Sequence, residues 1–199
     1  MEKEQEILLK KVKTFVKELF EKELPKNMYF HSFEHTLLVV EGVKIICKQN
    51  SVSENELLML TLAAFLHDVG YTKQYIGHEL ASVKIAYEFL LENGLERDQI
   101  EVVSNCILAT KYPQLPDTDL EKIICDADFY HFSLQSYTDF ATRLKREWEE
   151  NLSLVYTDRE WDAINIKMLT GHEYFTTFGK QILQKKKNLN IEKLIQRFT

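Results

Sequence analysis

The stretch Phe65-Leu66-His67-Asp68-Val69-Gly70 places an imidazole and a carboxylate side by side at the end of an apolar run. Residues 54–69 are apolar on nearly every side, which is typical of a helix in the centre of a bundle. We expect Gly70 to end this helix, so that His67 and Asp68 emerge from its last turn. Burying such groups is unfavourable unless something pairs with them, and a metal ion is a common partner.

Two further stretches carry His or Asp within apolar surroundings. Upstream lies Tyr29-Phe30-His31-Ser32-Phe33-Glu34-His35-Thr36, and downstream lies Ile123-Ile124-Cys125-Asp126-Ala127-Asp128. In each, we expect the hydrophobic neighbours to bring the polar side chain to a buried place. The three stretches together predict one polar cluster at the heart of the fold.

The composition narrows the class of protein. A chain of 199 residues can form one sizeable domain with a well-buried core. Its formal net charge of −6 argues against a nucleic-acid-binding surface, which would normally be basic. Cys47, Cys106 and Cys125 lie in apolar surroundings without CxxC spacing, which predicts reduced core residues. Such cysteines lead us to expect a cytoplasmic protein. We expect the charged N-terminus to start a helix and not to be a signal peptide. No apolar run is long enough to span a bilayer, and we expect no membrane partner.

The hydrophobic pattern predicts an all-α protein. Apolar residues recur at helical spacing, Gly and Pro are scarce, and no run alternates with period two for long enough to require a sheet. We predict a single domain over residues 1–199, with a motif-bearing core at about 29–132 and flanking helices at 2–24 and 134–199. A capping box at Thr157–Glu160 should open a long helix to about Lys186, and Asn190 should cap a short last helix. Other helices are expected at residues 32–49, 78–93, 97–110, 119–131 and 134–149.

The chemistry of the cluster favours a metal centre. Adjacent helical residues point about 100° apart, so His67 and Asp68 can approach one ion from neighbouring directions. His35 can add a second imidazole, and Asp126 or Asp128 a second carboxylate. Such a mixed set suits Mn²⁺, Fe²⁺ or Zn²⁺ with positions left open for water or substrate. Because such an ion lowers the pKa of bound water and neutralises charge on a phosphoryl oxygen, the set makes sense for phosphoester hydrolysis.

The order His35, His67-Asp68, Asp128 resembles the HD superfamily of metal-dependent phosphohydrolases, over about residues 29–132. The resemblance implies a helical bundle of the HD type that holds a divalent ion, whether Mn, Fe, Zn, Mg, Ni or Co. It makes His35, His67, Asp68 and Asp128 the metal ligands, since the family's closing Asp follows Ala, and leaves Asp126 beside the site. It also implies a catalytic role for Asp68 and, by similarity to the cyclic-nucleotide phosphodiesterase branch, for His31 as general acid. The implied substrate is a nucleotide or other small phosphoester.

Some members of that superfamily hold two metals through extra histidines. His78 stands where one of these is often found, but residues 109–111 contain no His for the second. His78 is therefore expected to be a structural residue or a substrate contact rather than a ligand, and Lys111 could place a positive charge over a phosphate. Arg143, Lys145 and Arg146 are further phosphate candidates that the sequence does not rank, and the roles of His131 and His172 stay open.

Two other functions are compatible with the same residues. The chain could be a sensor module that holds a metal and a nucleotide without turning the nucleotide over, since the second metal's His is missing. A di-iron oxygenase, as in a few HD relatives, would require two irons. The oligomeric state is left open.

Overall fold

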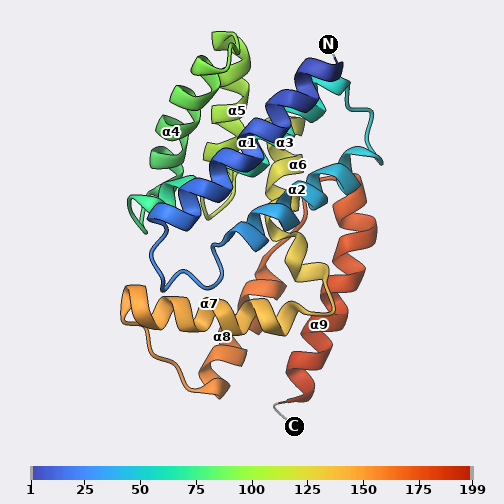
Figure 1. The fold of residues 1–199 in the computed structure, drawn as a ribbon. Helices are drawn as coiled ribbons and strands as arrows, with labels where there is room; N and C mark the ends of the chain where they lie inside the picture. Colours follow the sequence, from blue (N-terminus) through green and yellow to red (C-terminus); the bar gives the residue numbers. More distant parts are fainter. Residues whose placement is uncertain (1, 198–199) are drawn as a thin grey trace.

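The computed structural model describes residues 2–197, and in this range it contains nine α-helices and no strand (Figure 1). The predicted all-α class is confirmed. Figure 1 shows α4 and α5 at the end of the molecule opposite α7 and α8. The helices are α1 (Glu2–Glu23), α2 (Phe33–Cys47), α3 (Glu54–Leu66), α4 (His78–Glu92), α5 (Arg97–Ala109), α6 (Asp119–Asp128), α7 (Tyr137–Leu152), α8 (Asp158–Gly171) and α9 (Gln184–Gln196). Two 3₁₀ turns, η1 (Val69–Thr72) and η2 (Phe129–Ser133), and a π-helical segment, η3 (Gly179–Leu183), lie between them.

Helix α3 is the centre of the bundle and contacts α1, α2, α5 and α6. Ser53 and Glu56 form the capping box that satisfies its first backbone N–H groups. From Leu58 to Leu66 every residue is buried, as the all-round apolar pattern predicts. The next two residues, His67 and Asp68, are therefore fixed by the most rigidly packed element of the fold.

Gly70 does not end α3, contrary to the expectation from the sequence. The helix ends at Leu66, and Gly70 lies inside η1. A Cβ added to Gly70 would lie 1.9 Å from the backbone oxygen of His78, so the glycine is required by the close approach of α4. The Gly70 N–H also donates to Ser82 Oγ at 2.8 Å, which ties η1 to α4.

Helices α2 and α6 pack closely, and this contact brings together residues far apart in sequence. A Cβ on Gly42 of α2 would lie only 3.2 Å from the backbone of Ala127 in α6. This close approach places the start of α2, with His35, near the end of α6, with Asp128.

The predicted long helix from Thr157 to about Lys186 is wrong, although its capping box is present. The helix stops at Gly171, and His172 has extended backbone angles. The reason is the buried carboxylate of Asp126, which accepts hydrogen bonds from the N–H groups of Phe175 and Thr176 at 2.7 and 2.9 Å. These N–H groups are thereby held outside a helix, and the chain becomes helical again only beyond them.

Asn190 does not cap a last helix, which corrects a second expectation. It lies inside α9 and is buried, and its amide donates to the carbonyl oxygens of Phe132 and Leu134 at 2.9 and 2.8 Å. Asn190 thus joins α9 to η2. A small apolar cluster, made of Phe132, Tyr137, Ala141, Leu169 and Leu194, packs α7, α8 and α9 together there.

The remaining expectations concern cysteines and membranes. Cys47, Cys106 and Cys125 are buried free thiols, as predicted. Within residues 2–197, no helix combines the length and the apolar character that crossing a bilayer requires.

Candidate metal centre

Four side chains from three parts of the chain converge beside the end of α3. The Nε2 atom of His35 lies 3.6 Å from Asp68 Oδ2 and 3.3 Å from Asp128 Oδ1. The Nε2 atom of His67 lies 3.1 Å from Asp68 Oδ2 and 3.8 Å from Asp128 Oδ1. One donor atom each from His35, His67 and Asp128 lies within 4.8 Å of the others, so this group could hold a metal ion. Asp68 approaches the same two imidazole nitrogens.

Two atoms of these side chains that could bind a metal have no hydrogen-bond partner. His67 Nε2 and Asp68 Oδ2 are buried and make no hydrogen bond. The other ring nitrogen of His67, Nδ1, lies 2.9 Å from the carbonyl oxygen of Ala64. Donation to that oxygen places the proton on Nδ1 and leaves Nε2 as a free lone pair, which is the arrangement typical of metal-bound histidines. Buried polar atoms without a partner are rare, so these orphans favour a bound cation.

The electrostatics of the cluster also favour a positive charge at its centre. Burial alone lowers the pKa of His67, but the carboxylates of Asp68 and Asp128 raise it to about 9. Burial likewise opposes ionisation of Asp68, yet its imidazole neighbours hold the pKa of that carboxyl well below the usual range. Two ionised carboxylates therefore face the two imidazoles. A divalent ion would supply the positive charge that protons otherwise provide, and the donor set fits such an ion.

His31 lies beside this cluster in a hydrogen-bonded chain. Its Nδ1 donates to Glu147 Oε1, and its Nε2 lies 3.0 Å from the Tyr71 hydroxyl. Its ring stacks on Tyr71, with 4.1 Å between ring centroids, and Tyr71 stacks in turn on His78 at 3.8 Å. Burial alone lowers the pKa of His31, but the hydrogen bond and charge of Glu147 raise it above its ordinary value. A raised pKa favours the protonated form that a general acid needs.

Glu147 is the functional candidate that sequence reasoning missed. It is completely buried, and its Oε2 accepts hydrogen bonds from the N–H groups of Phe30 and His31 at 2.7 and 3.1 Å. Its Oε1 accepts from His31 Nδ1 and from the Tyr75 hydroxyl. The signal in the sequence is its register: Glu147 falls three residues after Leu144, on the inner face of α7, where a charge is out of place.

A cavity of about 650 Å³ opens over the cluster. Asp68, Asp128 and His31 form part of its inner wall. Side chains of α7, of the following loop and of α8 form the outer wall, including Trp148, Tyr156 and Met168. The site is therefore open to a small molecule on one side and closed by the bundle on the other.

Only some of the other predicted residues line the cavity. His78 lines it, with Nε2 at 3.5 Å from Asp68 Oδ1. Lys111 is exposed just beyond the end of α5 and does not line the cavity. His131 lines the cavity, and its Nδ1 lies 3.0 Å from the Asp128 carbonyl oxygen. His172 lies outside it, next to Lys187, and Asp126 anchors residues 175–176 instead of facing the cluster.

Comparison with protein families identifies the part of the chain that carries these side chains. A model described as "HD domain" matches residues 32–133, just over half of the chain. The match runs from the residue before α2 to the end of η2 and so includes all four converging side chains. Neither a search of curated proteins nor a search of solved structures finds a match.

Proposed function

The chain belongs to the HD domain family, and from this premise we propose that it is a metal-dependent phosphohydrolase that cleaves a nucleotide or another small phosphoester. The observation that carries the proposal is the convergence of His35, His67, Asp68 and Asp128 beside a cavity that also contains His31. A single phosphoryl group could reach both the ion-binding residues and an acid.

In this proposal the four converging side chains hold one divalent ion. When bound, the ion supplies Lewis-acid chemistry, activating water and polarising the phosphoryl group. Asp68 and Asp128 balance its charge, and the Ala64 carbonyl oxygen fixes the orientation of His67. Three of these groups are buried and Asp128 is half-buried, so they would position the substrate phosphorus without reorganisation of the chain.

His31 protonates the leaving oxygen. Its raised pKa keeps a proton available near neutral pH, and Glu147 holds its ring toward the cavity. General acids of this kind typically contribute about 10²- to 10⁴-fold to the rate. His78, stacked on Tyr71 at the cavity wall, is proposed as a substrate contact.

The test is phosphate release from a panel of phosphoesters, assayed with Mn²⁺, Mg²⁺ and Ni²⁺ in turn. The proposal expects turnover that a chelator abolishes and a single metal restores. Asp68→Ala should lose both metal and turnover, whereas Asp139→Ala, which changes an exposed carboxylate on α7, should keep both. Binding without release on every substrate would contradict the enzyme and favour the sensor module, and full turnover by metal-free Asp68→Ala would end the proposal.

A further inference from the structure

The outer wall of the cavity differs in character from its inner wall. Leu144 and Trp148 of α7, Tyr156 of the following loop, and Ile164 and Met168 of α8 all line it. These residues lie beyond residue 133, outside the part of the chain that the family model matches. This wall is therefore a feature of the chain's own C-terminal helices.

The aromatic residues of this wall are held in place by a second layer. Trp161 is buried, and its indole N–H donates to the Ala141 carbonyl oxygen at 3.1 Å. Trp148 packs edge-on against Trp161 with 5.3 Å between ring centroids, and Tyr156 packs against the same ring at 5.9 Å. A flat apolar surface that is already ordered binds a ligand without a further loss of side-chain entropy.

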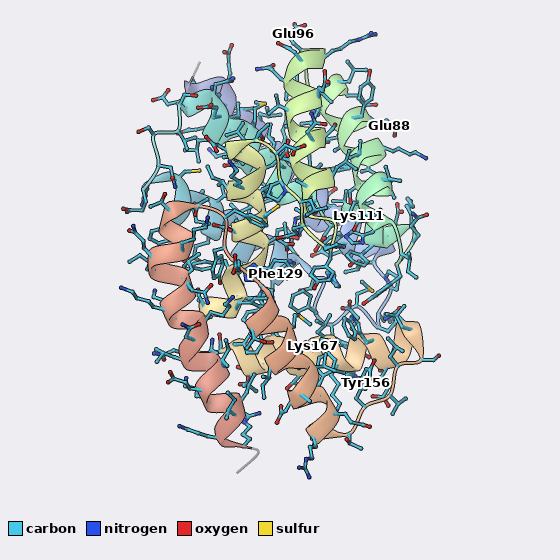
Figure 2. All side chains as sticks on the ribbon, turned by 180° about the vertical axis from the view of Figure 1, so that it is seen from behind. Glu88, Glu96, Lys111, Phe129, Tyr156 and Lys167 are labelled. Atoms are coloured by element: carbon cyan, nitrogen blue, oxygen red, sulfur yellow. The ribbon has the colours of Figure 1, made fainter. Side chains whose placement is uncertain are left out.

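The charges around the cavity are mostly negative. Three carboxylates line it, those of Asp68, Glu79 and Asp128, and among the described lining residues Lys167 is the one lysine or arginine. Figure 2 shows Lys167 on α8, between Phe129 and Tyr156, while Lys111 lies apart at the end of α5. The other basic candidates are engaged elsewhere: Arg143, Lys145 and Arg146 form ion pairs with Glu34, Asp158 and Glu150.

One divalent ion balances the two carboxylates that hold it and leaves Glu79 facing the cavity. A triphosphate or polyphosphate would add several further negative charges. Of the lining residues that the structure describes, Lys167 is the one lysine or arginine that could offset them, and a proton on His31 is already balanced by the Glu147 carboxylate. A single phosphoryl group with a flat, weakly polar substituent instead matches both walls, because its charge meets the ion and its substituent stacks on Trp148 and Tyr156.

We infer that the substrate is a phosphoester with one phosphoryl group and an aromatic or nucleobase substituent, and not a triphosphate or polyphosphate. The inference rests on the proposed function for the position of the phosphate. Recognition of the substituent rests on the wall formed by α7 and α8.

The first experiment is calorimetric binding of phenylphosphonate and methylphosphonate to the Mn²⁺-loaded full chain. Neither compound is hydrolysed, so binding is measured without turnover. Stacking predicts that phenylphosphonate binds at least about tenfold more tightly. Trp148→Leu, which keeps an apolar side chain and removes the flat ring, should largely abolish that preference. Tyr87→Ala, which removes an exposed aromatic residue outside the cavity, should preserve it.

The second experiment compares AMP with ATP as competing ligands at constant free Mn²⁺. Both carry the same base and differ only in the number of phosphates. AMP should therefore bind more tightly, because the extra negative charges of ATP face a mostly negative cavity. Equal binding of the two phosphonates, or a preference for ATP, would overturn the inference even if phosphate release is observed. Selective binding of phenylphosphonate and AMP without release from any phosphoester would support the ligand class and contradict the hydrolase.

Discussion

Replacing Glu147 by Gln should separate the general-acid role of His31 from the chemistry that depends on the metal. The carboxylate accepts four hydrogen bonds, two on each oxygen, from Phe30, His31 and Tyr75. A glutamine has one carbonyl oxygen and can serve only two of these donors. The backbone N–H groups of Phe30 and His31 cannot turn away, so we expect the carbonyl oxygen to face them and the amide NH₂ to face the His31 ring.

This change forces His31 to accept at Nδ1 and to hold its proton on Nε2, without the negative charge that raises its pKa. Hydrogen bonds to a charged group contribute about 1.5–3 kcal/mol and neutral ones about 0.5–1.5 kcal/mol. We therefore expect Glu147→Gln to lower the free energy of unfolding by about 1–3 kcal/mol. The acid should weaken, which lowers kcat about 100-fold for an alkyl phosphoester that needs a proton on its leaving oxygen.

The assay compares that alkyl ester with a 4-nitrophenyl ester of the same phosphate. The nitrophenolate leaves without a proton, so its release should fall only a few-fold in Glu147→Gln. Urea denaturation of both proteins in chelator measures the change in stability, and Tyr75→Phe, which removes one donor and keeps the carboxylate, serves as the control. Equal losses on the two esters would refute the assignment of Glu147 as the residue that positions His31.

Three further predictions concern packing, charge and metal. Gly70→Ala should lower the free energy of unfolding by about 3 kcal/mol or more in denaturant titrations, because its Cβ meets the His78 backbone. The control Gly171→Ala, whose Cβ would meet open space, should change the free energy of unfolding by under about 1 kcal/mol. Burial lowers the pKa of Lys187 to about 8, so its charged form destabilises the fold at neutral pH. Relative to Lys187→Met, the wild type should gain stability as pH rises from about 8 to about 10, by up to about 3 kcal/mol in urea titrations, and a constant difference would contradict this. Mn²⁺ at about 100 times its Kd should add about 2.7 kcal/mol to the free energy of unfolding, measured by thermal denaturation, and the same addition should leave Asp68→Ala unchanged.

Local patterns in the sequence predicted most of the helices correctly. The apolar periodicity of residues 54–66 and the capping boxes at Ser53 and Thr157 depend on near neighbours, and the structure contains both boxes. The same stretch predicted where His67 and Asp68 would lie, at the end of the most buried helix.

The features that sequence reasoning missed depend on contacts between distant residues. The break after Gly171 is held by Asp126, which lies 49 positions before Phe175. Gly70 resembles a helix stop but is required by the approach of α4. Glu147 meets His31 from 116 positions away, and no spacing rule connects them.

The central claim is that His35, His67, Asp68 and Asp128 hold one divalent ion, and the metal content of the purified chain tests it most directly. Elemental analysis after saturation with Mn²⁺ and removal of unbound ion should give one ion per chain for the wild type and for Asp139→Ala. Asp68→Ala and His67→Ala should retain almost none while keeping the helical content of the wild type. Full metal content in both of these variants would contradict the account.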